Sequence, residues 1–145
     1  EYFAKKANLI AISDDSGLVI DPLSGAPGIY SSRWAGPTND FNVAIEKIYN
    51  ELKKIKFKWS KRKEIVARFI SCLTLHWPNG KFISSTGIVE GRISVIKKGT
   101  NGFGYDPIFI PSGYEKTFGE LNPQEKIKID HRSKAFLKIS NLFIN

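Results

Sequence analysis

The chain has 145 residues, of which 41% are hydrophobic and 25% are charged, and its net charge at pH 7 is +8. This length and composition predict one soluble globular domain that buries its core without disulfides. No apolar run is long enough to cross a bilayer and the first residues lack the features of a signal peptide, so we expect a cytoplasmic protein without membrane association.

The positive charge comes mainly from lysine. The chain has 17 Lys and only 5 Arg, alongside 19 Ile, as expected from a general bias toward Lys and Ile. Because residues that contact phosphates or bases in a bidentate manner are preferentially Arg, this composition argues against nucleic acid as the main partner. The same positive field would favour a small anionic substrate.

The first residues, 1–7, have the pattern of the last turns of a helix, so we expect further chain upstream. Apolar residues then predict one strand at 8–13 and another at 18–21. Asp14 and Asp15 fall between these strands, before a Ser-Gly pair that permits a bend. Two interpretations remain open: carboxylates at a strand end hold Mg²⁺, or the acids bind local backbone amides in an Asx-type turn.

A stretch rich in Pro and Gly at 22–37 predicts a structured loop. A helix follows, with Thr38 or Asn39 available as N-cap and Asp40 in its first turn. Three- and four-residue spacings predict one apolar face on this helix, formed by Phe41, Ile45, Ile48, Leu52 and Ile55. The basic stretch at 56–63 is predicted to be a solvated turn.

A β-hairpin is predicted in the middle of the chain. Strands at 64–77 and 81–95 are joined by Pro78-Asn79-Gly80, and Asn-Gly favours a tight turn. Gly87 and Gly91 in the second strand suggest a bulge or bend. Cys72 lies in an apolar run, which indicates a buried thiol. Strands that alternate with helices, together with this antiparallel ribbon, predict an α/β fold with a mixed sheet.

The stretch "TNGFGYDPIFIP" at 100–111 is a glycine-rich loop that leads into a short strand. It lacks the Lys of a phosphate-binding P-loop and the third Gly of a dinucleotide fingerprint. Glycines on both sides of Phe103 would allow its ring to be exposed, and such a ring suits a purine stacked on its face. The alternative is a hairpin bend with Phe103 folded into the core.

Clustered donors precede the last helix. Asn122 and Pro123 predict the start of a short helix that contains Lys126, and His131 and Arg132 begin the final one. Either the His-Arg pair reads carbonyls or phosphates of a ligand, or His131 caps the helix and Arg132 makes a surface ion pair. The final helix is predicted to bury Phe136, Ile139, Leu142 and Phe143.

Several segments, in this order, resemble the inosine triphosphate pyrophosphatase family, also called Ham1-like: "SDDSGLVID", "GAPGIYSSRWAG", "GFGYDPIFIP", and "KTFGEL" followed by "EKIKIDHRSKA". The resemblance spans nearly the whole chain. It implies one domain over 1–145, with an elongated, twisted, mixed sheet flanked by helices and an active-site cleft between two lobes. It also implies Mg²⁺-dependent hydrolysis of ITP, dITP and XTP to the monophosphate and pyrophosphate by a protein that is usually a homodimer.

Matched motif by motif, the resemblance gives Asp15 as proton acceptor and metal ligand, with Asp14 as a further candidate ligand. Ser16 matches a substrate contact. The segment matched to base binding comprises Phe103, Gly104, Tyr105 and Asp106. The substrate-contacting lysine and the pair that reads the oxo edge of the purine match Lys126, His131 and Arg132.

The family's opening strand has no counterpart in this sequence, nor do its Ser/Thr-x-Asn-x-x-Lys phosphate loop and a further acidic metal ligand. We therefore expect the chain to be N-terminally incomplete, with the second acidic ligand upstream of Glu1. Two other functions remain as alternatives: a chain that binds nucleotide without turning it over, and a basic nucleic-acid-binding protein.

Overall fold

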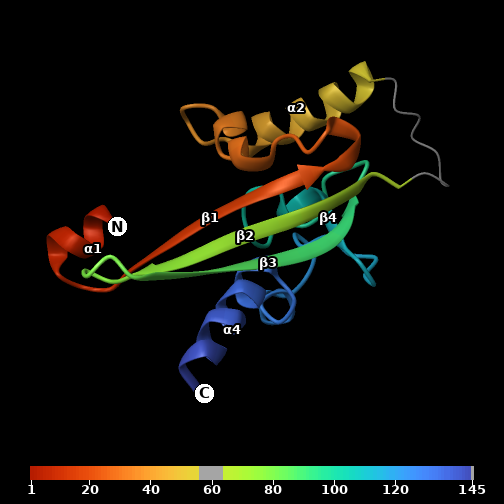
Figure 1. The fold of residues 1–145 in the computed structure, drawn as a ribbon. Coiled ribbons are helices and arrows are strands. Elements are labelled where there is room, and N and C mark those ends of the chain that lie inside the picture. The colour runs from red at the N-terminus through yellow and green to blue at the C-terminus, as the bar shows by residue number, and fades with distance from the viewer. Residues whose placement is uncertain (56–63, 145) are drawn as a thin grey trace.

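The computed structural model describes residues 1–55 and 64–144, so the predicted turn at 56–63 lies outside the described residues. Four strands form one sheet in the order β1-β2-β3-β4: β1 (Ala11–Ile20), β2 (Val66–His76), β3 (Phe82–Ile93) and β4 (Phe109–Pro111). The helices are α1 (Tyr2–Ala7), α2 (Phe41–Lys54), α3 (Pro123–Lys126) and α4 (His131–Ile144). The three long strands run side by side, with α2 near one end of β1 and α4 beside β3 (Figure 1).

The α/β class is confirmed. Every pairing within the described part of the chain is antiparallel, where the sequence had suggested a mixed sheet. The hairpin of β2 and β3 forms as predicted, because the backbone N–H of Trp77 donates to the carbonyl of Lys81 at 2.8 Å and Gly80 adopts φ 90° in the turn.

β1 is one continuous strand, so the prediction of two strands at 8–13 and 18–21 is wrong. It pairs with β2 without a break, from Ala11 opposite His76 to Ile20 opposite Ala67. Asp14 and Asp15 therefore lie in the middle of a strand, at neither a strand end nor a turn. The local sequence is typical of a turn, but ten consecutive cross-strand pairs outweigh that preference.

The glycines of β3 do not form the predicted bulge, since the register with β2 is unbroken along the strand. They permit close packing instead. A Cβ on Gly87 would lie 1.9 Å from the carbonyl oxygen of His131, and one on Gly91 would lie 2.3 Å from that of Ile110. Gly87 thus allows the start of α4 to lie directly against the sheet.

The N-cap of α2 is Asp40, whose carboxylate accepts a hydrogen bond from the backbone N–H of Asn42 at 2.9 Å. The predicted caps, Thr38 and Asn39, are not used. The helix buries the expected face, except that Ile55 lies beyond its end and is exposed. This face joins a main core that also contains residues of all four strands and of the loop after β4.

The final helix buries less than predicted. Ile139 is buried in a small second cluster with Leu73 and Ala135, whereas Phe136 and Leu142 are exposed. The predicted burial of the Phe143 side chain lies outside the described part. Only a narrow stripe of α4 contacts the sheet, because Gly87 and Ala135 hold the helix close to the strand.

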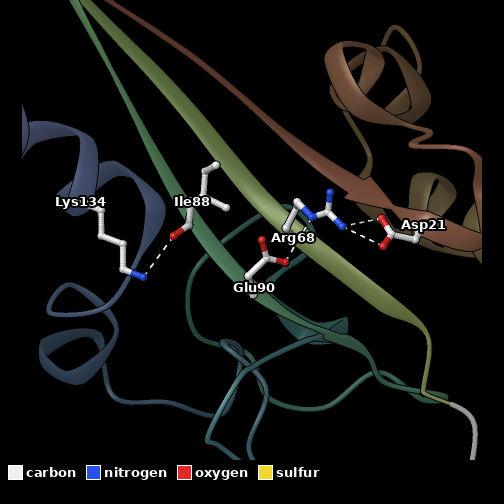
Figure 2. Close-up of polar contacts among 5 residues, drawn as sticks. All are labelled: Asp21, Arg68, Ile88, Glu90 and Lys134. Carbon is white, nitrogen blue, oxygen red and sulfur yellow. Dashed lines mark hydrogen bonds and ion pairs between the residues drawn. The ribbon is translucent and has the colours of Figure 1, made fainter.

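Lysines of α4 cover the open edge of β3. β4 pairs only with Gly91, Arg92 and Ile93, so the preceding carbonyls on that edge need other partners. Lys134 Nζ donates to the Ile88 carbonyl at 3.1 Å (Figure 2), and Lys138 Nζ donates to the Thr86 carbonyl at 2.6 Å. These contacts position α4 along β3 and satisfy strand carbonyls that would otherwise be open to pairing with another chain.

Candidate functional site

A cavity of about 250 Å³ lies beside β1, the 103–106 loop and the start of α4. We call it the aromatic cavity, because four of its lining side chains are aromatic: Phe41, Phe69, Phe103 and Tyr105. It is smaller than the roughly 300 to 1,000 Å³ of sites for drug-sized ligands, so its size suits a single ring system. The sequence-predicted site residues that line it are Ser16, Phe103, Gly104, Tyr105, Asp106, His131 and Arg132.

Phe103 presents its ring to solvent at this cavity, with 63% of the residue exposed. Gly102 and Gly104 flank it with φ values of 75° and 66°, which glycine adopts without strain. The backbone N–H of Phe103 donates to Asp106 Oδ2 at 2.8 Å, which fixes the loop. The prediction of an exposed Phe103 ring is therefore confirmed, and the alternative, in which Phe103 folds into the core, is wrong.

Lys126 and Asp106 form an ion pair behind the Phe103 loop. The distance from Lys126 Nζ to Asp106 Oδ2 is 2.6 Å, and both side chains are largely buried. Burial raises the pKa of Asp106, while the hydrogen bond from Lys126 and its positive charge oppose that rise. Lys126 Nζ also lies 5.2 Å from the centre of the Phe103 ring, so the lysine contacts the loop although it does not line the cavity.

Tyr105 links the Phe103 loop to the 22–37 loop. Its hydroxyl donates to the carbonyl of Ser31 at 2.8 Å, and its ring packs edge-on against Phe41 with 5.2 Å between centroids. The hydroxyl is therefore already bonded. The "KTFGEL" segment supports the same loop from behind, since the N–H of Gly119 donates to the Asp106 carbonyl at 2.9 Å.

His131 is buried and neutral. Its ring stacks on Phe69 at 4.8 Å, and burial together with the charge of Arg132 lowers the pKa of His131 to about 4. Nε2 lies 3.2 Å from Arg132 Nη1, and a guanidinium only donates, so Nε2 accepts and the proton is assigned to Nδ1. That buried Nδ1 has no hydrogen-bond partner within residues 1–55 and 64–144.

Arg132 is held from the side by Asp14. Arg132 Nε donates to Asp14 Oδ2 at 2.5 Å, while Ser16 and Ser71 donate to Asp14 Oδ1 at 2.7 and 3.0 Å. Burial acts to raise the pKa of Asp14, but the hydrogen bonds and the Arg132 charge outweigh it and the net shift is downward. Both oxygens of this carboxylate are already bonded.

The aromatic cavity is close to electrically neutral. Lys126 is paired with Asp106, Arg132 is paired with Asp14, and His131 is uncharged. A neutral heterocycle would therefore fit this environment better than a polyphosphate, whose charge would need unpaired cations. The sequence did not single out Phe69 or Phe41 as part of this site, because each reads as an ordinary core residue of a strand or helix.

Asp15 faces the other side of β1, because adjacent side chains of a strand alternate. It is exposed and lines a second cavity of about 190 Å³ with residues such as Ile70 and Cys72; we call this the edge cavity. The two cavities share Ser16 and Gly17 in their linings, so they meet at β1, which is an edge strand of the described sheet. Cys72, opposite Asp15 in the ladder, is exposed and not buried as predicted.

The Asp15 carboxylate forms no hydrogen bond or ion pair with any described residue. Those residues also contain no group of three or more His, Cys, Asp or Glu able to hold a metal ion. A single free carboxylate fits Mg²⁺ when the remaining ligands are water and substrate phosphates, as this ion prefers. Of the two acids, Asp15 is therefore the one whose carboxylate is unbonded among the described residues.

Comparison with known proteins places these features in a family. The Ham1 family model matches residues 1–142. A dITP/XTP pyrophosphatase of Rhodospirillum centenum is 44% identical over 136 residues, which are 94% of this chain and 65% of that protein. A dITP/XTP pyrophosphatase of Caulobacter vibrioides is 43% identical over 138 residues, which are 95% of this chain and 69% of that protein.

Solved structures agree with this match. A HAM1 protein from Coxiella burnetii superposes with a TM-score of 0.86 at 36% identity, over 97% of this chain and 70% of that one. The Staphylococcus aureus Ham1 protein gives a TM-score of 0.84 at the same identity, over 97% and 69%. The chain thus spans about two thirds of the length of the relatives it matches. None of the helices in its described part is long and apolar enough to cross a membrane.

Proposed function

This chain belongs to the Ham1 family, and from that membership and the geometry of the two cavities we propose that it acts in the hydrolysis of deaminated purine nucleoside triphosphates. The substrates proposed are ITP, dITP and XTP, and the products are the nucleoside monophosphate and pyrophosphate. The observation that carries this proposal is the aromatic cavity: an exposed Phe103 ring beside a neutral His131 that has an unpartnered N–H.

The purine would stack on Phe103 and present its oxo edge to His131 and Arg132. Aromatic stacking is sequence-tolerant, because every base has a π-face, so it supplies affinity more than selectivity. Selectivity would come from donors. Nδ1–H of His131 and the free N–H groups of Arg132 match a carbonyl, whereas the 6-amino group of adenine would leave them unpaired, and unpaired buried donors give strong discrimination.

The phosphates would pass around the edge of β1. The aromatic cavity has paired charges, and the edge cavity, which begins at Ser16 and Gly17, contains the free carboxylate of Asp15. A base on one side of β1 and phosphates near Asp15 on the other is the arrangement that gives each part of the substrate a compatible environment. Ser16, which lines both cavities, would contact the substrate between its base and its phosphates.

Asp15 is the residue proposed to act on the reacting water. Its carboxylate would hold Mg²⁺ and orient or deprotonate the water that attacks the α-phosphorus. The bond between the α-phosphorus and the bridging oxygen then breaks, and pyrophosphate leaves. Bound Mg²⁺ supplies charge neutralisation for the phosphates.

A substrate comparison tests the proposed function. The purified protein is incubated with Mg²⁺ and ITP, XTP, GTP or ATP, and pyrophosphate release is measured. We expect kcat/KM for ITP and XTP to exceed that for ATP by at least about a hundredfold, because a donor set built for an oxo group rejects an amino group. Equal hydrolysis of ITP and ATP, or release of inorganic phosphate in place of pyrophosphate, would contradict the proposal.

A second arm of this experiment tests the role of Asp15. Asp15→Asn keeps the shape of the side chain but removes its charge, so we expect kcat for ITP to fall by at least about a hundredfold, within the range contributed by a general base. Asp21→Asn is the matched control, because it is the same substitution just after β1 at a residue that lines neither cavity, and it should leave kcat unchanged. Full activity in Asp15→Asn would exclude this mechanism.

We further propose a cytoplasmic homodimer, in line with the family resemblance. Support comes from exposed apolar side chains on α4, including Phe136, Leu137 and Leu142, which a second subunit would cover. Light scattering on the purified protein measures the mass directly, and a monomer at all concentrations would contradict the dimer.

A further inference from the structure

We propose that Asp14 is a positioning residue, which holds the Arg132 guanidinium in place for base recognition and does not bind metal. This inference rests on the proposed function and concerns Asp14, the one of the two adjacent acids whose role the sequence left open. It begins from the observation that the two acids lie on opposite faces of one strand, so they need not serve one site.

Both oxygens of the Asp14 carboxylate accept hydrogen bonds from protein donors. Oδ1 accepts from the hydroxyls of Ser16 and Ser71, and Oδ2 accepts from Arg132 Nε. Ser71 is completely buried and lies on the neighbouring strand, so it fixes the carboxylate against the sheet. A metal ion at Asp14 would compete with the Arg132 guanidinium or with two hydroxyls for the carboxylate oxygens, whereas the Asp15 carboxylate has no such competitor among the described residues.

Arg132 is held by three contacts that together define its plane. Nε is bonded to Asp14, Nη1 lies 3.2 Å from His131 Nε2, and the guanidinium carbon lies 5.2 Å from the centre of the Phe103 ring. Two of the five guanidinium N–H groups are used in these bonds, which leaves three for a ligand. Without Asp14, the Arg132 side chain, which is 37% exposed, would regain several rotamers.

The same contact fixes His131 indirectly. Because Arg132 Nη1 donates to His131 Nε2, the His131 proton lies on Nδ1. If the guanidinium were displaced, the proton would no longer be fixed on that nitrogen. Asp14 therefore supports both donors of the proposed oxo-reading pair while it contacts neither the base nor the phosphates. Its loss should weaken substrate binding through the base and leave the chemistry at the α-phosphorus intact.

The test is Asp14→Asn, which keeps the size and the hydroxyl contacts but removes the charge. We expect KM for ITP to rise roughly tenfold, the usual effect of losing a charge-assisted hydrogen bond, with kcat changed less than about threefold. The preference for ITP over ATP should fall, and the Mg²⁺ concentration for half-maximal activity should stay the same. A shift in that Mg²⁺ concentration would overturn the proposal in favour of a metal ligand.

Asp21→Asn is the matched control. Asp21 directly follows β1 and forms an ion pair with Arg68, in which both hydrogen bonds from Arg68 Nη2 are 2.7 Å long (Figure 2). This pair is exposed to a degree similar to that of Asp14 and Arg132. The Asp21–Arg68 pair should not affect base recognition, since neither residue lines the aromatic cavity. We expect its KM for ITP to match the wild type. An equal rise in KM in both variants would mean a general structural effect and would overturn the assignment to Asp14.

A double-mutant cycle with Arg132→Lys separates direct from indirect action. Lysine has no Nε–H fork, so if Asp14 acts through Arg132, adding Asp14→Asn to Arg132→Lys should raise KM by less than about twofold. A further tenfold rise would contradict the proposal. If Asp14→Asn folds poorly, Ser71→Ala removes one support of the carboxylate and should give a smaller rise in KM in the same direction; no rise there would count against it.

The failure of this inference is distinguishable from failure of the proposed function. A wild-type protein that releases no pyrophosphate from ITP would contradict the function, whereas an active wild type with an unaltered Asp14→Asn variant would contradict only the positioning role. A readout independent of activity is the Nε–H resonance of Arg132 in ¹⁵N NMR spectra. We expect it to be protected from solvent exchange in the wild type and in Asp21→Asn, and lost in Asp14→Asn; protection in all three would overturn the proposal.

Discussion

At the scale of single residues, the site depends on polar side chains whose charges are cancelled or suppressed. Asp106 and Asp14 each neutralise one cation, and His131 stays uncharged because it is stacked on Phe69 away from water. A neutral imidazole with an assigned proton is a directional donor, whereas an imidazolium would donate from both nitrogens and compete with Arg132. The burial that makes His131 selective should therefore also be measurable as a pH effect.

We predict that His131 makes the protein less stable in mild acid. The pKa of His131 is lowered from 6.5 to about 4 on folding, so between these pH values the unfolded chain binds a proton that the folded chain does not bind. The free energy of unfolding is therefore highest above pH 6.5 and decreases as the pH falls toward 4. The shift corresponds to about 3 kcal/mol of unfolding free energy.

Urea unfolding of the wild type and of His131→Phe between pH 4.5 and 7.5 measures this effect. Phenylalanine keeps the stack on Phe69 but does not titrate, so the difference in unfolding free energy between the two proteins should favour His131→Phe increasingly as the pH drops. A difference that stays constant over this range would show that His131 is not held neutral. Mutation elsewhere in the same ladder, such as Thr86→Ala, should leave the wild-type pH slope unchanged.

At the scale of secondary-structure elements, the decisive contact is between α4 and β3. The helix brings His131 and Arg132 to the aromatic cavity, and it lies where it does because Gly87 has no side chain and because Lys134 and Lys138 bind carbonyls of β3. The sequence showed both the helix and the strand. It did not show their contact, since a glycine inside a strand is compatible with a bulge or with a close neighbour.

We predict that Gly87→Ala displaces the start of α4. The new Cβ would lie 1.9 Å from the carbonyl oxygen of His131 and 2.5 Å from the backbone nitrogen of Ala135, and backbone atoms cannot turn away as a flexible side chain would. Overpacking of this kind costs about 1 to 3 kcal/mol of stability. We expect lower unfolding free energy in urea and a raised KM for ITP in the same variant.

Thr86→Ala is the control for Gly87→Ala, because its side chain is on the opposite, exposed face of the same strand. Thr86→Ala should change the free energy of unfolding by less than about 0.5 kcal/mol and should leave KM for ITP unchanged. If Gly87→Ala behaved like Thr86→Ala, the close approach of α4 would not be needed to position the His-Arg pair.

The elements that the sequence predicted correctly have strong local signals: the period of α2, the Asn-Gly turn of the hairpin, and Asn122-Pro123 at the start of α3. Two of the errors share one cause. β1 was divided because Asp14 to Gly17 resemble a turn, and Cys72 was expected inside because its neighbours are apolar, yet both outcomes depend on pairing with a distant strand. Likewise, the motifs grouped the site residues and favoured Asp15 over Asp14, but only the structure shows which side chains Asp14 binds.

At the scale of the whole molecule, the long sheet carries two cores of unequal size. The main core joins α2, the strands and the loop after β4, while α4 covers only a small cluster around Leu73, Ala135 and Ile139. The aromatic cavity receives residues from both regions, with Leu18 and Phe69 from the main core and Arg132 from α4. The hairpin end should therefore open more readily than the end near α2.

We predict that amide hydrogen exchange differs along a single strand. Amides of β2 at 72–76 should exchange faster than those at 67–70, because the first group is covered by the small cluster and the second by the main core. The comparison is internal, since both groups belong to the same ladder with β3. Uniform protection along β2, measured by exchange and mass spectrometry or NMR, would mean that the two cores unfold as one unit.

The alternation of Asp14 and Asp15 has a consequence for how reliably this sheet must assemble. If β1 slipped by one residue against β2, every side chain would change face: Asp15 would meet Arg132, and the free carboxylate would be lost from the edge. A pairing that slipped in this way would also turn Leu18 and Ile20 out of the core. The correct register of β1 against β2 thus depends on the same few residues that separate base recognition from phosphate chemistry. A single-residue deletion before Asp14 should therefore reduce both the stability of the sheet and the activity.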